Sequence, residues 1–560
     1  MILYNGKSIL VCIPARGGSK GIPRKNVRLM NNNPLISYVI NTAKSSSLVD
    51  EVIVSTDDVE IKEVSQKYGT LVVDRDGKFS EDSIPLDPVI NDAVGQIEKI
   101  KEKKFDIVVT VQPTSPLLRV ETLDRAIMNL VDNGMVDTII SVVDDRHLSW
   151  TVQDGKSVPK YEKRLNRQYL PKEFRETGAI LATKRRCITE NSRIGKSVDL
   201  IEVSKNESID IDSYEDWWVA EKLLKRKKIL IRTDATNEIG TGHVYRQLYI
   251  ASRIMDHEVI FLMNTKNKLG VNLVKGSNFS IITFNDNESE KILEVNPDII
   301  INDILDTSDE YMSFLKERNI FSINFEDMGE GAKKADLVFN ALYEYRLPLK
   351  NIYGGHKYYI LRDEFKEHNK KIVNRTVNKM LVTFGGSDPN NFTEKVIDII
   401  DNHYKDINID IILGLGYKEK EKIRNKYKDN DKISIFDSVK NISKYMYGSD
   451  IVVTSGGRTM YEVASLGIPC LVLCQNEREL THLFGHAGNG IINLGLGEHL
   501  TEGMIKNTIG ELIENYELRS DMNAKMKSID LEHGFDNIID VVTTEYSKFK
   551  SILLKDKGEI

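Results

Sequence analysis

The sequence is poor in cysteine and has no long hydrophobic run. No stretch of about 18 apolar residues occurs, so we expect no membrane-spanning helix. The first residues lack a basic segment followed by a long apolar one, so we expect no signal peptide and a cytoplasmic location. The few thiols are scattered, and we expect them to be buried rather than joined in a metal site or a disulfide: Cys12, Cys187, Cys470 and Cys474.

Positive charge is in slight deficit, with a net charge of −7 at pH 7. A nucleic-acid-binding protein needs a basic face, so this balance argues against a nucleic-acid partner. Hydrophobic residues make up 41% and charged residues 29% of the chain, which is typical of a globular protein. At 560 residues the chain is too long for one core, and about 150 residues per domain predicts three to four domains.

A glycine-rich, basic loop occupies residues 13 to 26. It follows the apolar run at 8 to 12, which predicts a buried strand whose carboxyl end would present the loop to a ligand. Its glycines let backbone amides turn toward an anion, and its cations suit a triphosphate: Arg16, Lys20, Arg24 and Lys25. The spacing matches neither a P-loop nor a dinucleotide fingerprint. The alternative is a solvated basic turn, which has no need of this charge density.

This loop resembles the signature loop of the CMP-sialic acid synthetases, the cytidylyltransferases that activate nine-carbon 2-keto sugar acids. The resemblance covers roughly the first 220 residues, through further motifs in family order at 55–58, 112–119, 167–171, 177–180 and 210–212. It implies a Rossmann-like, GT-A-like nucleotidyltransferase domain at 1–227, with CTP and a sugar acid as substrates. In that family the segment matching 144–172 forms a dimerisation arm, which implies a homodimer through the N-terminal domain.

The resemblance also implies roles for individual residues. The catalytic phosphate contacts fall on Arg16, Lys20 and Lys25. The other nucleotide contacts fall on Gly17, Gly18, Ser19, Asn26, Arg75, Asp82 and Ser83. The acidic sugar would meet Gln112, Arg167 and Gln168, and the guanidinium of Arg167 can bind both oxygens of a carboxylate. Thr177 stands where the family often has asparagine.

Asp210 and Asp212 are two residues apart, and on a strand their side chains would share a face. Both carboxylates could then bind one Mg²⁺, a hard cation that suits oxygen ligands and a triphosphate. The spacing alone fits an edge strand with two solvated acids equally well. The resemblance favours the metal, because the family's metal-binding pair falls on these two residues.

From residue 229 the alternation of apolar runs and helical stretches restarts, which predicts two further Rossmann-like domains in a GT-B-like pair. We place them at 228–372 and 373–560, joined by the polar segment at 366 to 378. The whole chain is therefore expected to be α/β with mostly parallel sheets.

Two glycine turns stand out in this second half. His243 directly follows one of them at a strand-to-helix junction, where a histidine is a candidate general base, although a lone histidine is more often structural. Gly456 and Gly457 form the other, where a diphosphate could lie on the N-terminus of a helix that contains Thr459. Glu462 could then accept hydrogen bonds from ribose hydroxyls, or it could be a solvated acid that complements the helix dipole.

These turns resemble the GT-B-type hydrolase of pseudaminic acid biosynthesis, which removes UDP from a diacetamido-trideoxy sugar, over about residues 228 to 545. The resemblance implies that His243 activates water, that the last domain holds UDP and that no metal is needed in this half. Weaker family positions fall on Asp234, Asn340, Glu326 and Asp327, of which the first two are expected to bind the substrate. The chain departs from the family at 474–476 and at 302–305.

We therefore expect a bifunctional enzyme of nonulosonic (sialic, pseudaminic or legionaminic) acid biosynthesis. The alternatives for the second half are a GT-B glycosyltransferase and a non-catalytic module that binds sugar nucleotides.

Overall fold

The computed structural model describes residues 4–18, 21–81, 83–235, 241–343, 349–437 and 439–556. It divides into two compact units, Met1–Arg226 and Lys227–Ile560. None of the described helices is both long and apolar enough to cross a membrane. The cysteines are free, and three of them, Cys12, Cys470 and Cys474, are buried as expected, whereas Cys187 is only partly buried, contrary to the prediction.

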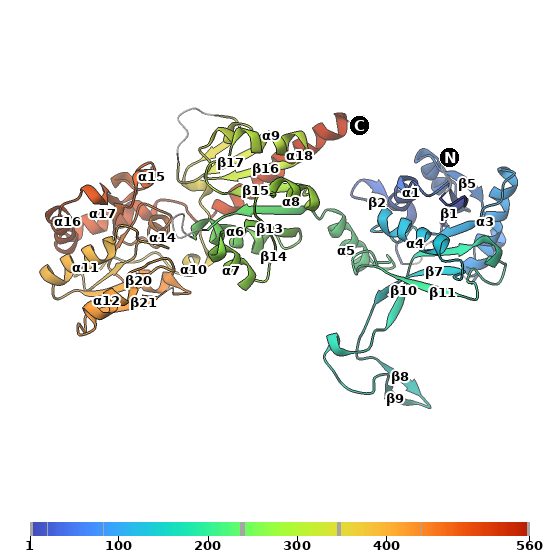
Figure 1. Cartoon of the computed structure of the whole chain (residues 1–560), viewed down its shortest axis with the longest axis horizontal. Helices are drawn as coiled ribbons and strands as arrows, with labels where there is room; N and C mark the ends of the chain where they lie inside the picture. Colours follow the sequence, from blue (N-terminus) through green and yellow to red (C-terminus); the bar gives the residue numbers. More distant parts are fainter. Residues whose placement is uncertain are drawn as a thin grey trace. The chain divides into compact units, whose positions relative to one another are not determined.

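The first unit is built on a seven-stranded sheet in the order β11-β7-β10-β6-β1-β4-β5 (Figure 1). Its strands are β1 Ile9–Pro14, β4 Glu51–Thr56, β5 Leu71–Asp74, β6 Ile107–Thr110, β7 Thr138–Asp144, β10 Phe174–Lys184 and β11 Val198–Glu202. β10 runs antiparallel to both of its neighbours, and the other pairs are parallel. The predicted α/β class with mostly parallel sheets is confirmed.

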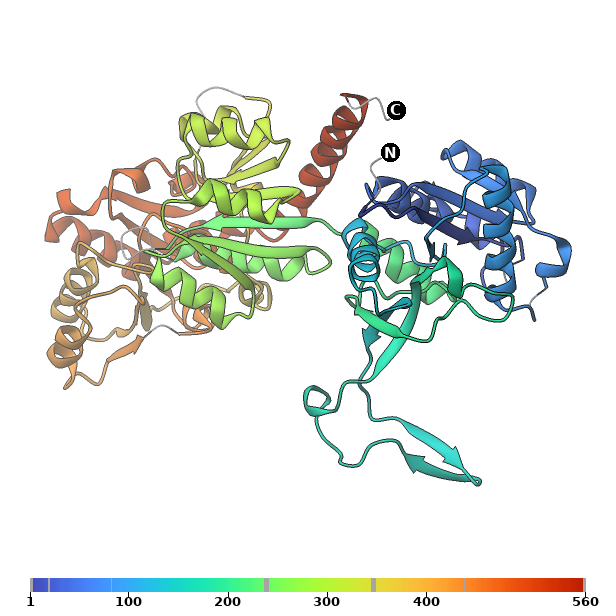
Figure 2. The same cartoon turned by 45° about the vertical axis from the view of Figure 1, so that its right-hand side comes forward.

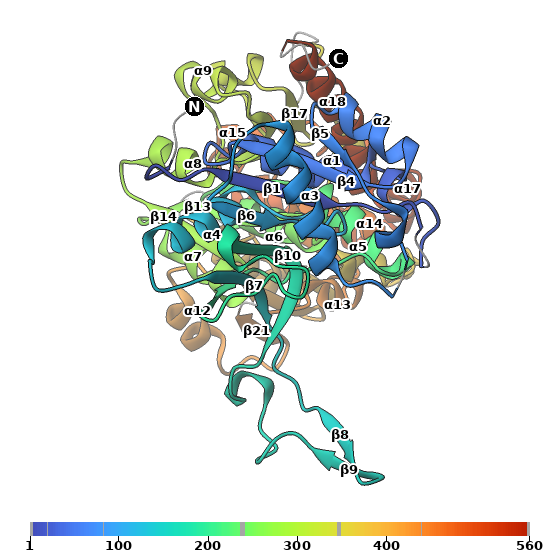
Figure 3. The ribbon, with the colours of Figure 1, turned by 90° about the vertical axis from the view of Figure 1, so that its right-hand side faces the viewer.

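Helices cover both faces of this sheet because alternate residues of β1 point to opposite sides. Ile9, Val11 and Ile13 pack with α1 Leu35–Ser45, α2 Val59–Lys67 and α4 Val120–Asp132. Leu10 and Cys12 pack with α3 Leu86–Ile100, which crosses the other face (Figure 3). A smaller core joins α5 Tyr214–Leu224 to Met30 of β2 Leu29–Met30 and to Leu35 at the start of α1. β2 pairs with β3 Asn33–Pro34, and the short helix η1 Lys25–Val27 precedes them.

The segment predicted to form an arm is a separate hairpin of β8 Trp150–Gln153 and β9 Lys156–Pro159. It projects away from the seven-stranded sheet in two views (Figures 1 and 2). Trp150 and Val152 are 56% and 69% exposed, so the hairpin adds nothing to the core of this unit. The homodimer remains a prediction.

The second unit contains two fully parallel sheets. The first has the order β14-β13-β12-β15-β16-β17-β18: β12 Lys228–Thr233, β13 Glu258–Asn264, β14 Ser280–Phe284, β15 Ile299–Asp303, β16 Phe321–Phe325, β17 Leu337–Asn340 and β18 Ile352–Gly354. The other has the order β21-β20-β19-β22-β23-β24: β19 Lys379–Val382, β20 Asn408–Leu413, β21 Ile433–Asp437, β22 Ile451–Thr454, β23 Cys470–Cys474 and β24 Ile491–Leu496. This pair of doubly wound sheets is the GT-B-like arrangement that was predicted.

Helices follow most of these strands. Those of the first sheet are α6 Gly242–Arg253, α7 Lys268–Gly276, α8 Glu288–Val295 and α9 Asp309–Glu317. The connecting segment, residues 355–378 between the two sheets, carries α10 Asp363–Lys366. The helices of the other sheet are α11 Phe392–His403, α12 Lys420–Tyr427, α13 Ile442–Tyr447, α14 Thr459–Leu466, α15 Glu477–Leu480, α16 Glu502–Glu514 and α17 Tyr516–Lys527.

The last helix, α18 Gly534–Asp556, packs in the core of the first of these two sheets. Tyr546 and Phe549 lie edge-on to Phe321 of β16, with ring centroids 5.2 and 5.1 Å apart. The predicted domain at 373–560 differs from the structure here, because the chain crosses back after α17. Apolar periodicity identifies such a helix but does not say which sheet it covers.

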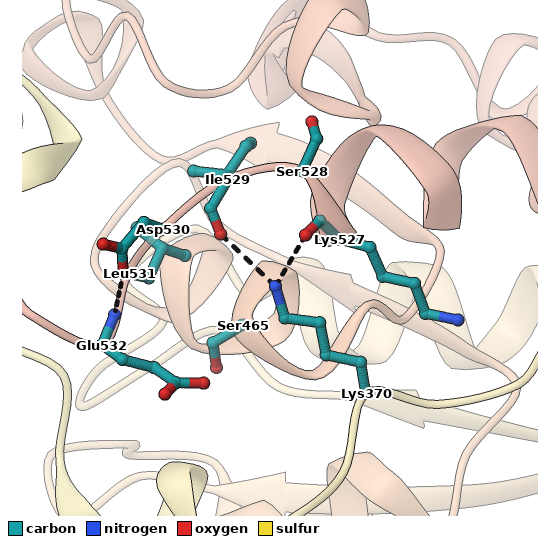
Figure 4. A pocket seen from close by; sticks show the side chains of 8 residues that line it. All are labelled: Lys370, Ser465, Lys527, Ser528, Ile529, Asp530, Leu531 and Glu532. Atoms are coloured by element: carbon teal, nitrogen blue, oxygen red, sulfur yellow. Dashed lines mark hydrogen bonds between the residues drawn. The ribbon is translucent and has the colours of Figure 1, made fainter.

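The returning chain is anchored beside the other connection between the two halves. Lys370 Nζ donates to the carbonyl oxygens of Lys527, at 2.8 Å, and Ile529, at 3.4 Å (Figure 4). Together with Ser465 and residues 528 to 532 they line a small pocket. A cationic side chain thus satisfies carbonyls that the end of α17 leaves free.

Gly534→Ala is expected to destabilise the second unit. A Cβ at Gly534 would overlap the backbone carbonyl of Tyr359, so α18 would have to shift on its sheet, and overpacking of this kind costs roughly 1–3 kcal/mol. Thermal unfolding of the full chain measures the effect. Gly503→Ala on α16, where the nearest atom lies 4.0 Å from the new Cβ, is the matched control, and equal midpoints for both variants would contradict the prediction.

Candidate functional sites

The glycine-rich loop leaves the carboxyl end of β1 and is held by the end of the neighbouring strand β4. Gly17 N donates to Asp57 Oδ1 at 3.1 Å, and Asn26 Nδ2 donates to the carbonyl of Arg16 at 3.0 Å. A Cβ at Gly17 would lie 2.6 Å from Asp58 Oδ2, so the loop needs glycine for this close approach. The predicted contacts Ser19, Lys20 and Asp82 lie outside the described residues.

Two of the predicted phosphate-binding cations are engaged with acids in this structure. The guanidinium of Arg24 makes bonds of 2.5 and 2.9 Å to Asp58 and also pairs with Glu60, at the start of α2. Lys25 Nζ donates to the carbonyl of Ile211 and to Asp212 Oδ1, the latter at 3.2 Å. Arg24 therefore fixes the loop to α2, whereas Lys25 links it to the predicted metal pair.

Asp210 and Asp212 do not lie on a β-strand, contrary to the prediction. They flank the buried Ile211 in an extended segment that is fixed by one backbone bond, from Ile211 N to the carbonyl of Thr114 at 2.9 Å. Asp212 then leads into α5, where its own N–H donates to Asp216 at 3.2 Å. The alternation of acid and apolar residues resembles a strand, but the segment pairs with no strand among the described residues.

The two carboxylates nevertheless fit a divalent cation. Asp210 Oδ1 is buried and has no hydrogen-bond partner among the described residues. Burial is the largest influence on the pKa of Asp210 and raises it. A hydrogen bond from Thr114 and the positive charge of Lys25 lower this pKa, whereas the negative charge of Asp212 raises it. No group of three or more potential metal ligands gathers among the described His, Cys, Asp and Glu side chains. Mg²⁺ would thus take two protein oxygens here and complete its shell with phosphate and water.

The predicted base and sugar contacts divide into two groups. Arg75 is buried, and its Nη2 donates to the carbonyl of Ser55 at 2.9 Å, at the end of β4. Burial lowers the pKa of Arg75. Gln112 lies against Gly178, whose φ of +71° and close approach both favour glycine. Both side chains therefore sit where neighbouring strands end, beside the glycine-rich loop.

The other group is exposed. Arg167 and Gln168 lie in η3 Arg167–Tyr169, and the carbonyl of Gln168 accepts a 3.4 Å bond from Arg146. Ser83 is exposed as well. Among the described residues, these side chains make no hydrogen bond to the loop. Thr177, at the position of the family's asparagine, is buried and its Oγ1 lies 2.7 Å from Ser141 Oγ, inside the sheet.

In the second unit, His243 lies in the first turn of α6 and contacts Asp303 at the end of β15. Nδ1 of His243 is hydrogen-bonded to Oδ1 of Asp303, which is fully buried. A carboxylate acceptor keeps the proton on Nδ1, so the lone pair of the neutral ring is on Nε2. This arrangement suits a general base.

Arg246 holds this carboxylate in place. It donates to Asp303 at 2.8 and 2.7 Å and to Glu326 Oε1 at 3.0 Å. Although burial alone would raise the pKa of Asp303, the charges and hydrogen bonds of Arg246 and His243 hold it below its usual range. Burial raises the pKa of Glu326. Neither Asp303 nor Arg246 was predicted as a site residue, although Asp303 ends a strand that is parallel to β12 and a strand-end acid is a recognisable signal.

Polar atoms without partners gather in the same region. The buried atoms that lack a hydrogen-bond partner among the described residues include Thr233 Oγ1, Gln247 Oε1, Thr454 Oγ1, Arg458 Nη1 and His482 Nε2. Thr233 and Thr454 end the central strands of the two sheets, and a Cβ at Gly242 would lie 3.2 Å from Arg458 Cδ. Buried groups of this kind are normally satisfied, so the cluster indicates a ligand or water site between the two halves of this unit.

Hydrogen bonds to side chains hold the second glycine turn. Gly456 N donates to Glu479 Oε2 at 3.0 Å, and its carbonyl accepts a 2.6 Å bond from His482 Nδ1. Gly457 and Thr459 are only partly buried at the start of α14. Glu462, one turn later, is 7% exposed and pairs with Arg362 at 2.9 Å, so it is not a solvated acid.

The remaining predicted contacts belong to polar networks of the first sheet. Asp234 pairs with Arg232 at 2.7 Å and also with Asn267. Asn340 is fully buried, and its amide makes two 3.0 Å bonds to the backbone of Asp327. The Asn340 amide thus fixes a turn at the end of β16, and its contact with a substrate remains a prediction.

Comparisons with known proteins agree with this division into two units. Residues 10–191 match the family model described as cytidylyltransferase, and residues 380–542 match that of the glycosyltransferase family 28 C-terminal domain. The post-translational flagellin modification protein B of Campylobacter coli is 32% identical over 228 residues, which are 40% of this chain and 97% of that protein. The chain belongs to the cytidylyltransferase family.

The chain is also similar to two further relatives and to a solved structure. CMP-N,N'-diacetyllegionaminic acid synthase of Campylobacter jejuni is 31% identical over 227 residues, 40% of this chain and 97% of that protein. An uncharacterized protein of Methanocaldococcus jannaschii is 33% identical over 272 residues, 45% of this chain, and the chain spans only 56% of its length. A solved structure of MurG from Acinetobacter baumannii resembles 57% of this chain and 99% of its own, with 14% identity and a TM-score of 0.43.

Asp210→Asn is expected to raise the thermal midpoint of the first unit at pH 7. The pKa of Asp210 is higher in the folded chain than its unfolded value of 3.8. Asp210 therefore stabilises the fold when the pH is below 3.8, and this stabilisation is lost as the pH rises through the folded pKa. An amide does not suffer this loss, so we expect a gain of about 2–4 °C, the shift that about 1 kcal/mol produces in a domain of this size. Added Mg²⁺ should stabilise the wild type and not the variant.

Asp216→Asn is the matched control with the opposite sign. Although burial raises the pKa of Asp216, hydrogen bonds from Ser213 and Asp212 lower it. Its stability is therefore present at neutral pH and is lost as pH falls through the folded pKa, so the variant should unfold earlier at pH 7. A lower midpoint for Asp210→Asn would show that Oδ1 is stabilised in the folded protein and would contradict this view of the site.

Proposed function

We propose that the first unit transfers CMP from CTP to a nonulosonic acid and releases pyrophosphate. Family membership supports a cytidylyltransferase, and relatives named for legionaminic and pseudaminic acid support this class of acceptor. The observation that carries the proposal is a carboxylate oxygen of Asp210 that has no partner among the described residues and lies near Lys25 and the glycine-rich loop at the end of β1. A basic loop and a pair of acids suit a triphosphate that arrives with a divalent cation.

The chain's own residues position the reactants. The anomeric hydroxyl oxygen of the sugar acid attacks the α-phosphorus of CTP, the bond to pyrophosphate breaks, and the hydroxyl proton leaves to solvent. Arg16 and Lys25 would neutralise the phosphates, and the loop's glycines would let its amides approach them. Arg75 and Gln112, which follow β5 and β6, would face the base and the sugar acid. Mg²⁺, held by Asp210 and Asp212, would stabilise the charge that develops on the phosphates.

Lys25→Ala should lower kcat/KM for CMP transfer by about 100- to 1000-fold, as expected for loss of one preorganised positive charge. Pyrophosphate release from CTP with N-acetylneuraminic, legionaminic or pseudaminic acid measures this in the full chain. Arg24→Ala is the control cation from the same loop, and its loss should be smaller because Arg24 is paired with Asp58 and Glu60. Equal losses would argue against the assignment of Lys25, and no turnover with any sugar acid would reject the acceptor class.

For the second unit we propose hydrolysis of a UDP-diacetamido-trideoxy sugar, with His243 as the base. Its support is the pair of His243 with buried Asp303 in a region rich in unpartnered polar atoms. His243 Nε2 would take a proton from water as the water oxygen attacks the anomeric carbon. The bond from that carbon to the diphosphate would break, and its electron pair would leave on the diphosphate. The match to a glycosyltransferase family 28 C-terminal domain favours a second candidate, transfer of the sugar to an acceptor hydroxyl.

His243→Ala should reduce release of UDP from such a sugar nucleotide by about 100- to 10,000-fold, the usual contribution of a general base. Asp303→Asn should cause a smaller loss because the ring remains but its tautomer is no longer fixed. Phosphorus NMR of the full chain follows the reaction, with the exposed His499→Ala as the control histidine. UDP release that requires an added sugar acceptor would replace the hydrolase with a transferase, and no release at all would favour a binding module.

A further inference from the structure

Glu462 is held by an arginine from the segment that connects the two halves of the second unit. Nε and Nη2 of Arg362 donate to the same oxygen, Glu462 Oε1, at 3.0 and 2.9 Å. The other oxygen, Oε2, has no hydrogen-bond partner among the described residues. The two residues are 100 positions apart in the sequence and meet at the first turn of α14.

Arg362 is itself fixed from its other side. Its Nη1 lies 2.6 Å from Glu364 Oε1, and Glu364 Oε2 accepts a 3.0 Å bond from the N–H of Ser443, at the start of α13. The guanidinium carbon lies 5.1 Å from the centre of the Phe365 ring, whose side chain is buried. A continuous set of contacts therefore runs from α13 through Glu364 and Arg362 to Glu462.

These contacts give the two carboxylate oxygens of Glu462 different roles. Two donors from a planar guanidinium fix one oxygen and with it the plane of the carboxylate. A nearly buried carboxylate without this partner would leave an uncompensated charge and would turn toward whatever donor it could reach. The fixed plane leaves Oε2 as an acceptor with a defined direction, which is what recognition of a ribose hydroxyl requires.

We propose that Arg362 is the positioning residue for ribose recognition in the second unit: it holds Glu462 through Oε1 so that Oε2 accepts the ribose hydroxyls of a nucleoside diphosphate. The proposal rests on the proposed function of this unit as a nucleotide-sugar site, and it does not depend on whether the sugar is hydrolysed or transferred. It makes nucleotide affinity sensitive to the connecting segment, since Arg362 lies just before α10.

The test is calorimetric binding to the full chain, with each nucleoside diphosphate compared with its 2',3'-dideoxy form. UDP is used first, followed by CDP, GDP and ADP. The wild type should bind the dideoxy form about 10- to 100-fold more weakly, the loss expected for hydrogen bonds to a charged acceptor. In Arg362→Gln this ratio should fall below about 3-fold, with weaker binding of the ribose form and little change for the dideoxy form.

Two further variants keep the test decisive. Arg362→Met retains the apolar stem without donors and replaces Arg362→Gln if that variant unfolds. Arg253→Gln is the matched control, because Arg253 pairs at 2.5 Å with Asp363, the residue next to Arg362, and takes no part in holding Glu462. The control should keep the wild-type ratio.

The outcomes separate the two ideas. An unchanged ratio in the Arg362 variants would overturn the positioning role while leaving ribose recognition intact. A wild-type ratio near one would overturn the assignment of Glu462 to ribose, and with it the positioning role. No binding of any nucleoside diphosphate would overturn the nucleotide site as well. If the wild type does not hydrolyse a UDP-sugar but binds the ribose form more tightly than the dideoxy form, only the proposed hydrolysis is rejected.

Discussion

Parallel pairing of strands decides where this protein can do chemistry. A parallel ladder directs the carboxyl ends of its strands to one edge, so the loops that follow them must meet there. In the first unit this places the glycine-rich loop after β1 beside Asp57 and Arg75 after β4 and β5, and Gln112 after β6. In the second unit it places His243 next to Asp303. Both sites are consequences of the same backbone constraint.

The buried carboxylates of the two sites differ in whether the chain supplies a partner for them. In the second unit, Arg246 satisfies Asp303 and Glu326 together, so the acid behind His243 stays ionised without exposure to water. In the first unit, one buried oxygen of Asp210 has no partner within the described parts of the chain, and the pKa of Asp210 is raised. A buried carboxylate of this kind reduces stability unless a cation joins it. The first site therefore depends on its ligand, whereas the His243 dyad is assembled by the chain itself.

Contacts between the two halves of the second unit are unusually specific. Tyr359 of the connecting segment stacks on Tyr461 of α14 with ring centroids 4.2 Å apart, and the hydroxyl of Tyr461 donates to the carbonyl of Ala341 at 2.8 Å. The return of α18 to the first sheet adds a second connection. The Arg362 to Glu462 contact lies in the same region, at the nucleotide site that we propose for this unit.

The sequence by itself determined the strands, the α/β class, the glycine-rich loop and the turn that carries His243, because each is a local pattern of apolar periodicity or glycine spacing. Tertiary structure alone decided which distant side chains complete the sites. Asp303 lies 60 residues from His243 and Arg362 lies 100 residues from Glu462, and no local pattern encodes such pairs. It also decided that Asp210 and Asp212 are not on a strand, that Asn340 fixes a turn and that α18 returns to the first sheet, since these depend on which neighbours the folded chain supplies.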